Sequence, residues 1–276
     1  MELSSVRVAE EALKYFSTTI RSIIQSVEQV VADKGVEEFT KKNLGMLLGM
    51  FKAYEHLWRA CESGSEQENL EFLKHISISE KNNLQFQETL EDFFNSEVEY
   101  DNLLDKLDTM LNPFPNIDGN ILDFQLQTLA DPDSRPNIRD IVEGSNFTWM
   151  EKVAALGCKV IIVSFGEREG ALRWKNDTNC PFNIYLDQDR KLYFALGMHR
   201  SLAKCWSRST NSFYVGAMLT GRKLITPYPD IKDDPLQMGG DILLQQNGNF
   251  VKKYLSQFPA DRPALKSFTD KMQTGS

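Results

Sequence analysis

Residues 159–165 of the chain are Lys-Val-Ile-Ile-Val-Ser-Phe, an almost unbroken run of β-branched and aromatic side chains. An apolar run of this length without alternation is typical of a strand that is buried on both faces, as in a parallel sheet. Gly166 follows the run, residues 167–175 have a helical pattern, and residues 182–186 form the next apolar run. A strand, a helix and a strand at this spacing predict a βαβ unit with a right-handed crossover.

The chain after this unit supplies further boundary signals. Asp187 ends the second strand and is expected to cap a helix over residues 189–196, which Gly197 closes. A loop-rich stretch follows. Asn247-Gly248, which tolerates positive φ, then predicts a tight hairpin turn between strands at residues 239–244 and 250–255.

Pro263 is a good first-turn residue and predicts a last helix over residues 263–272. Upstream, residues 124–129 alternate apolar and polar side chains, which favours an N-terminal edge hairpin. Parallel strands followed by an antiparallel hairpin and a helix are the order of a thioredoxin-like domain.

The first 110 residues have a helical period instead. Residues 13–30 carry one apolar stripe, and further stripes follow over residues 44–61, 70–76 and 90–111, the last with a possible interruption at Asn95-Ser96. Ser4 or Ser5 is expected to cap the first helix. The stripes predict a bundle core. We therefore expect an α+β protein with a helical bundle over residues 1–112 and a thioredoxin-like α/β domain over residues 113–276.

The composition of the chain argues against several classes of partner. The 276 residues carry a net charge of −8, which argues against a nucleic-acid partner because phosphate affinity comes from clustered cations. No apolar run approaches the length of a membrane span, and the first residues do not resemble a signal peptide, so we expect no membrane partner and a cytoplasmic location. No motif indicates a metal or a cofactor, and Cys61, Cys158, Cys180 and Cys205 form no CxxC pair.

Several short sequence motifs of the second half, taken in order, resemble those of the peroxiredoxin-like 2 family, which is related to alkyl-hydroperoxide-reductase/thiol-specific antioxidant domains. The motifs are LGCKV (156–160), VSFG (163–166), EGA (169–171) with Trp174, PF (181–182), YLDQDRKLY (185–193), LGM (196–198) with Arg200-Ser201, DDPLQMGGD (233–241) and DRP (261–263). The QMGGD motif and the helical extension are most similar to the selenoprotein L type within that family.

The resemblance implies a thioredoxin-fold redox protein, an antioxidant thiol oxidoreductase or peroxidase. Its partner would be a thiol reductant or a protein disulfide. In this family a strand ends in a CxxC pair, or its selenocysteine version, at the start of a helix. A helix N-terminus stabilises a thiolate, which attacks a peroxide or a disulfide, and the second sulfur resolves the adduct.

The sequence departs from the family at this place. Upstream of Gly157 no apolar strand lies between Val142 and Trp149, and no cysteine lies between Cys61 and Cys158. Either the chain is a shortened product without the strand and its CxxC, which we favour because the flanking motifs are intact, or the domain diverged and lost them. The lost strand is central in such a sheet, so its neighbours would lack a partner unless another segment fills the gap.

The remaining candidates for a site are few. Cys205, beside Lys204 and Arg208, is the first candidate for a replacement nucleophile, followed by Cys158 and Cys180, although a free cysteine at such places is usually a small buried hydrophobe. The candidates for a substrate groove are Gln237, Met238, Gly239, Gly240, His199 and Arg200.

Two functions remain open. The first is a redox protein by descent whose catalytic pair is missing, so that its activity is weak or lost. The second is a non-enzymatic interaction module that uses the helical bundle or the vacant groove. A glutathione-transferase-like arrangement ranks below both because the helical part comes first here.

Overall fold

The computed structural model describes residues 3–111, 120–143, 159–224, 228–264 and 267. Contacts divide the chain into two compact units. The helical unit comprises Met1–Pro113 and Ser201–Ile225, and the α/β unit comprises Phe114–Arg200 and Thr226–Ser276. None of the helices among the described residues is both long enough and apolar enough to cross a membrane.

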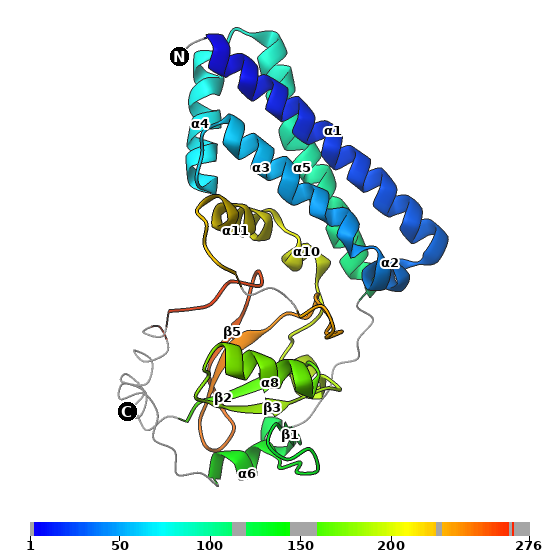
Figure 1. Ribbon diagram of the computed structural model, residues 1–276, viewed down its shortest axis with the longest axis vertical. Helices are drawn as coiled ribbons and strands as arrows, with labels where there is room; N and C mark the ends of the chain where they lie inside the picture. Colours follow the sequence, from blue (N-terminus) through cyan, green and yellow to red (C-terminus); the bar gives the residue numbers. More distant parts are fainter. Residues whose placement is uncertain (1–2, 112–119, 144–158, 225–227, 265–266, 268–276) are drawn as a thin grey trace. The chain divides into compact units, whose positions relative to one another are not determined.

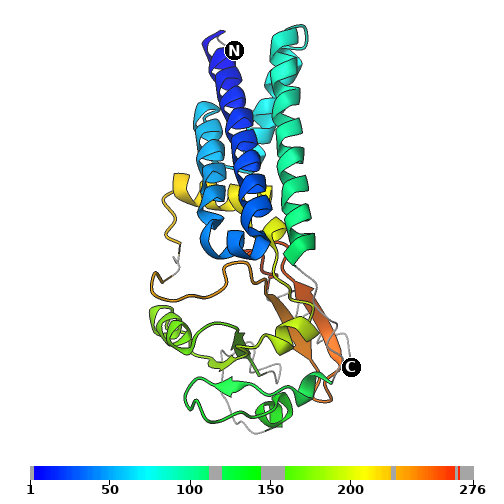
Figure 2. The same cartoon turned by 90° about the vertical axis from the view of Figure 1, so that its right-hand side faces the viewer.

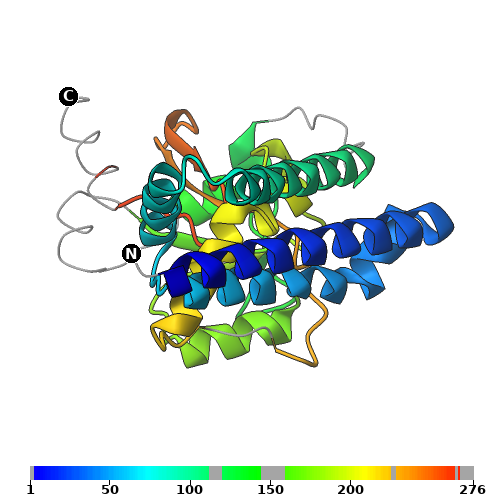
Figure 3. The ribbon, with the colours of Figure 1, turned by 90° about the horizontal axis from the view of Figure 1, so that it is seen from above.

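The helical unit is built on three long helices that lie side by side. In Figures 1, 2 and 3, α1 packs against α3 and α5 along their length. The elements of its N-terminal part are α1 (Leu3–Lys34), α2 (Val36–Lys42), the 3-10 helix η1 (Leu44–Leu48), α3 (Gly49–Ala60), α4 (Glu66–Ser79) and α5 (Leu84–Leu111).

The expected stripes form the core of this unit. Phe16 of α1 packs edge-on against Tyr54 of α3 and contacts Phe93 of α5, with ring centroids 4.8 and 4.7 Å apart. Two expectations were wrong in detail. Ser4 and Ser5 lie inside α1 rather than capping it, and α5 continues through Asn95-Ser96 without interruption, so that Val98 lies on its solvent side. An exposed Val does not interrupt a helix whose other apolar side chains are buried.

The helical unit also contains a segment that was expected from the sequence to be a loop-rich part of the second domain. Residues 201–225 form α10 (Leu202–Cys205) and α11 (Arg208–Leu219), which pack on α5 and α3. Asp108 of α5 accepts a hydrogen bond from Ser201 Oγ at 2.6 Å, and the Trp206 ring lies 5.4 Å from that of Phe51. The helical signal was missed because α11 is rich in Ser, Thr and Asn and gains its apolar contacts only by tertiary packing.

The α/β unit contains two separate pieces of sheet. A three-stranded sheet has the order β1-β3-β2, and a hairpin pairs β4 with β5. The elements in chain order are η2 (Ile121–Asp123), β1 (Gln127–Thr128), α6 (Ile138–Glu143), β2 (Ile161–Ser164), α8 (Arg168–Asp177), β3 (Asn183–Leu186), α9 (Lys191–Ala195), β4 (Gly240–Leu244) and β5 (Phe250–Leu255).

This arrangement confirms the expected α+β class with a helical N-terminal region. β2 and β3 pair in parallel across α8 as a βαβ unit, and β1 pairs antiparallel with β3 at the edge. β4 and β5 form the expected hairpin, and Gly248 in its turn has φ 87°. The expected helix at residues 263–272 lies largely outside the described residues.

One expectation about β2 was wrong. Its side chains are half-buried along the whole strand rather than buried on both faces, whereas three of the four residues of its neighbour β3 are buried. The strand is terminal in its sheet, so one of its edges has no strand partner among the described residues. The residues of an edge strand have the same β-propensity as those of an interior strand, but no neighbouring strand buries them on one side.

Candidate functional site

The most distinctive feature of the α/β unit is a cavity of about 420 Å³ that is lined by both pieces of sheet. One wall is Ile161, Ile162 and Val163 of β2, and the opposite wall runs from Gly239 through Asp241 and Ile242 to Leu244 of β4. Consecutive side chains of a strand point to opposite faces. A cavity that touches three consecutive residues of β2 therefore reaches the edge of the strand and not only one face. We refer to this cavity as the inter-sheet groove.

The backbone pairing shows which groups of β2 face the groove. Asp187 donates its N–H to Ser164 O at 2.8 Å, so the backbone of Ser164 is directed to β3. The N–H and C=O of a strand residue point to the same edge, and successive residues alternate. Ile161 and Val163 therefore present their backbone groups at the edge of β2 that has no strand partner among the described residues. Tyr193 reaches that edge, because its hydroxyl donates to Val163 O at 2.8 Å.

The same reasoning applies to β4. Ser256 donates its N–H to Gly239 O at 3.1 Å, and the register pairs Gly240 with Leu255 and Ile242 with Lys253. Gly239 and Asp241 therefore direct their backbone groups to β5. Gly240 and Ile242 direct theirs to the other edge, which lines the inter-sheet groove.

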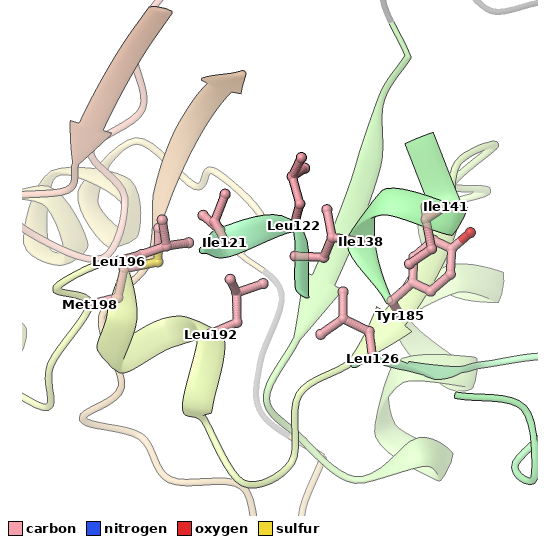
Figure 4. Packing of buried hydrophobic residues seen from close by; sticks show 9 residues of the cluster. All are labelled: Ile121, Leu122, Leu126, Ile138, Ile141, Tyr185, Leu192, Leu196 and Met198. Carbon is pink, nitrogen blue, oxygen red and sulfur yellow. The ribbon is translucent and has the colours of Figure 1, made fainter. Parts of the chain in front are cut away.

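A compact apolar cluster supports the groove. Figure 4 shows its buried side chains, which come from η2, α6, β3 and the α9 region. Ile161 and Val163 of β2, and Ile242 and Leu244 of β4, pack against this cluster while remaining partly exposed. The members are Ile121, Leu122, Leu126, Ile138, Ile141, Tyr185, Leu192, Leu196 and Met198.

The six groove candidates from the sequence lie next to one another, but only part of the set lines the groove. Arg200 and Gln237 form an isolated antiparallel bridge, and Met238 donates its N–H to His199 O at 3.2 Å. Gly239 and Gly240 line the inter-sheet groove. His199 is exposed and stacks on Phe194, with ring centroids 6.2 Å apart.

Ion pairs and hydrogen bonds fix this segment. Asp234 Oδ2 accepts from Arg190 Nη1 at 2.8 Å and lies 2.7 Å from Arg200 Nε. Gln237 Nε2 donates to Met198 O at 2.7 Å. The polar groups of Arg200 and Gln237 therefore hold the chain in place ahead of β4.

The described cysteines lie near helix ends, and Cys205 also lies two residues before Ser207, the N-cap of α11. Cys61 follows α3 as its C-cap, Cys205 is the last residue of α10, and Cys180 donates its backbone N–H to Lys175 O at the end of α8. All three are buried, and none of them forms a disulfide. The C-terminal end of a helix carries partial negative charge and does not stabilise an anion. Cys158 lies outside the described residues.

Burial adds to this effect at Cys61. Desolvation raises the pKa of its thiol to about 12, while a hydrogen bond with Asn69 acts in the opposite direction. The thiolate is the nucleophile in thiol chemistry, so a group with this pKa is unreactive at neutral pH. Cys61 is a core residue, as its apolar stripe indicates.

Asp187 accepts hydrogen bonds from the first turn of α9, in the capping role expected from the sequence. Its Oδ2 accepts the backbone N–H of Tyr193 at 3.0 Å. Burial raises the pKa of this carboxyl, and hydrogen bonds from the backbone of the first helical turn lower it. Within the described ranges, no group of three or more metal-ligating side chains is present.

Some groove residues were not found from the sequence. Tyr193 carries the hydroxyl that meets this edge of β2, and burial raises the pKa of that hydroxyl to about 12. Trp174 of α8 and Arg262 also line the groove. Tyr193 and Trp174 belong to motifs of the family resemblance, but nothing in their spacing shows that they line the same cavity.

Residues 147–255 match the family model described as AhpC/TSA antioxidant enzyme. The match includes the βαβ unit and both strands of the hairpin, and with the fold it supports a peroxiredoxin- or thioredoxin-like family for this part of the chain. No curated protein and no solved structure matches the chain.

Proposed function

We propose that this protein is a thioredoxin-fold redox protein by descent whose catalytic CxxC pair is absent from the chain, so that its thiol oxidoreductase or peroxidase activity is weak or lost. The observation that carries this proposal is the burial of the three described cysteines. Cys61 and Cys180 follow the C-terminal ends of α3 and α8, and Cys205 lies between the short helix α10 and Ser207, the N-cap of α11. A working peroxidatic thiol needs access to solvent as well as helix N–H groups or cations.

The two-piece sheet supports the absence of a strand together with its CxxC. The terminal strands β2 and β4 belong to different sheets, and both line the same cavity. This is the arrangement expected when the strand between two intact neighbours is lost. It favours the shortened chain over gradual divergence, because β2 and β3 keep a regular register and β4 and β5 stay paired along their length, with one bulge at Leu243–Leu244.

Finer parts of the proposal rest on the resemblance. The QMGGD motif at residues 237–241 and the helical extension favour the selenoprotein L type. A residual redox partner would be a thiol reductant or a protein disulfide, and a cytoplasmic location without a nucleic-acid or membrane partner fits the composition.

A peroxide-reduction assay with the full chain tests the proposal. We expect turnover of hydrogen peroxide with a thiol reductant to equal that of a variant in which Cys61, Cys158, Cys180 and Cys205 are all replaced by Ser. Single variants identify any exception. Turnover that clearly exceeds this control and is abolished by Cys205→Ser, Cys158→Ser or Cys180→Ser would show a replacement nucleophile and contradict the proposal.

The inter-sheet groove favours a second candidate function, a non-enzymatic interaction module. Strand edges with free backbone groups are templates for pairing with another chain. Pull-down of a defined partner that survives replacement of all four cysteines supports this function. Strict dependence of partner capture on a cysteine would point back to disulfide chemistry.

A further inference from the structure

Building on the interaction-module function, we propose that the inter-sheet groove binds a short, extended apolar segment of a partner protein, which inserts as a strand between β2 and β4. Such a segment pairs with both of these strand edges at once and joins the three-stranded sheet and the hairpin. The proposal concerns the backbone edges and needs no reactive cysteine.

The backbone groups on the two walls define the ligand class. Ile161 and Val163 on one wall, and Gly240 and Ile242 on the other, direct N–H and C=O groups to edges that line the groove. The Val163 carbonyl oxygen already accepts from the Tyr193 hydroxyl, so the groups of β2 for a new strand are the N–H of Val163 and both groups of Ile161. The backbone groups of a helix are hydrogen-bonded to one another, so a helix cannot form backbone hydrogen bonds with these strand edges. An extended peptide exposes N–H and C=O groups alternately on both sides and can pair with two neighbours.

The side chains of the walls define the composition of the segment. The lining is predominantly aliphatic and aromatic, and its charged residues are Asp241 and Arg262, which lie 4.0 Å apart. A charge on the inserted segment would lose its hydration without a partner along most of the groove. The segment is therefore uncharged, with β-branched or aromatic side chains that pack toward Leu192 and Met198 on one face.

The strands set its length. β2 has 4 residues and β4 has 5. At a rise of about 3.3 Å per residue, a segment of roughly four or five residues matches these edges. The half-buried state of every residue in β2 and β4 agrees with a core that is completed by another strand.

Hydrogen exchange of the full chain, in reducing buffer, tests this inference. The probe is a synthetic peptide with a five-residue core of valine, isoleucine and threonine between solubilising lysines. In the free protein we expect the amides of Ile161 and Val163 to exchange at least tenfold faster than those of Ile162 and Ser164, which pair with β3. Saturating peptide is expected to slow Ile161, Val163, Gly240 and Ile242 at least tenfold and to leave Ile162 and Ser164 unchanged.

A matched peptide that is N-methylated at alternate core residues is the control, since it keeps the side chains and loses donors on one side. We expect it to bind at least tenfold more weakly. In the protein, Ile242→Lys places a charge in the groove and is expected to weaken binding by a similar factor, whereas Ile78→Lys on the exposed face of α4 is not. If Ile242→Lys does not fold, the N-methylated peptide still provides the comparison.

Three results would overturn the inference. The alternating amides of β2 exchange equally slowly in the free protein, which would mean that the edge is already filled. The peptide does not bind. The peptide and its N-methylated form bind equally, which would indicate apolar adhesion without strand pairing. Because no peroxide is present, these results leave the redox proposal untouched, and peroxide turnover does not affect the test of strand binding.

Discussion

At the scale of single residues, one buried polar group links α11 to the bundle. Glu97 of α5 accepts from Tyr54 Oη at 2.7 Å and pairs with Arg208 Nη1 at 3.0 Å. Burial raises the pKa of Glu97, and the charge of Arg208 counteracts this effect. Removing one partner of a buried ion pair leaves the other charge uncompensated, which costs more than the pair itself contributes.

We therefore expect Arg208→Ala to lower the free energy of unfolding by about 2–4 kcal/mol. Denaturant unfolding followed by circular dichroism measures the loss. Arg59→Ala is the control, because Arg59 pairs with Glu55 on the surface of α3, with 63% of the Arg59 side chain exposed. A surface pair of this kind is worth only about 0.5 kcal/mol. Equal losses in the two variants would contradict a structural role for the Arg208–Glu97 pair.

Cys61 provides a second prediction at this scale. Because burial raises the pKa of its thiol from 9.0 to about 12, we expect alkylation at pH 8 to be at least about a hundredfold slower in the folded protein than in denaturant. The raised pKa means that burial of the protonated thiol stabilises the fold fully below pH 9. This contribution is lost as the pH rises toward 12. Mass spectrometry of iodoacetamide-treated protein gives the rates, and similar rates in both states would show that the thiol is accessible.

At the scale of elements, the start of β4 depends on a glycine. A Cβ at Gly240 would clash with the carbonyl oxygen of Tyr254 in β5 and would lie 3.1 Å from Met198 Cε. The carbonyl belongs to a paired strand and cannot move without disturbing the hairpin. In the pair Gly239-Gly240, a glycine is therefore needed at position 240 because the backbones of β4 and β5 approach each other closely there. The position of the pair at the start of a strand indicates such an approach.

Gly240→Ala is expected to destabilise the α/β unit by about 1–3 kcal/mol. Gly45→Ala in η1 is the matched control, because a Cβ there has nothing within 4 Å and the position does not require positive φ. We expect the control to be neutral or slightly stabilising. Hydrogen exchange of β4 and β5 locates the loss, and unchanged protection in Gly240→Ala would refute the steric argument.

At the scale of the whole molecule, the helical unit is assembled from two separated parts of the chain. The segment Ser201–Ile225 follows strand and helix elements of the α/β unit in sequence and yet packs with Met1–Pro113. The added Cβ of Gly216 in α11 would lie 3.7 Å from the Trp58 ring, and Tyr214 of α11 contacts Phe51 edge-on at 5.7 Å. α11 thus covers apolar side chains of α3.

We expect a protein of residues 1–113 alone to expose this surface. It should bind a hydrophobic dye more strongly and unfold at a lower temperature than the same bundle with a synthetic 201–225 peptide added. A peptide with Arg208 replaced by Ala serves as control and should restore less stability, because it lacks the ion pair with Glu97. A bundle of residues 1–113 that melts at the same temperature with and without the peptide would show that α11 is dispensable.

The sequence by itself determined the elements with strong local patterns. The stripe from Leu13 to Val27 is buried in α1, the run at 161–164 is a strand, and Asn247-Gly248 forms the hairpin turn. Side-chain periodicity and turn chemistry act over a few residues, so they can be recognised from the chain alone. The sequence motifs around the βαβ unit and the hairpin also indicated a peroxiredoxin- or thioredoxin-like family, which the match over residues 147–255 supports.

Only the tertiary structure decided which elements share a unit and which strand edges remain open. The polar helix α11 gains its place through Arg208 and Trp206, which meet partners more than a hundred residues earlier in the chain. β2 and β4 each have an edge without a strand partner in the described part of the chain, and the two edges line one groove although about eighty residues separate the strands. Such pairings depend on long-range packing of backbone edges, and no local pattern of residues records them.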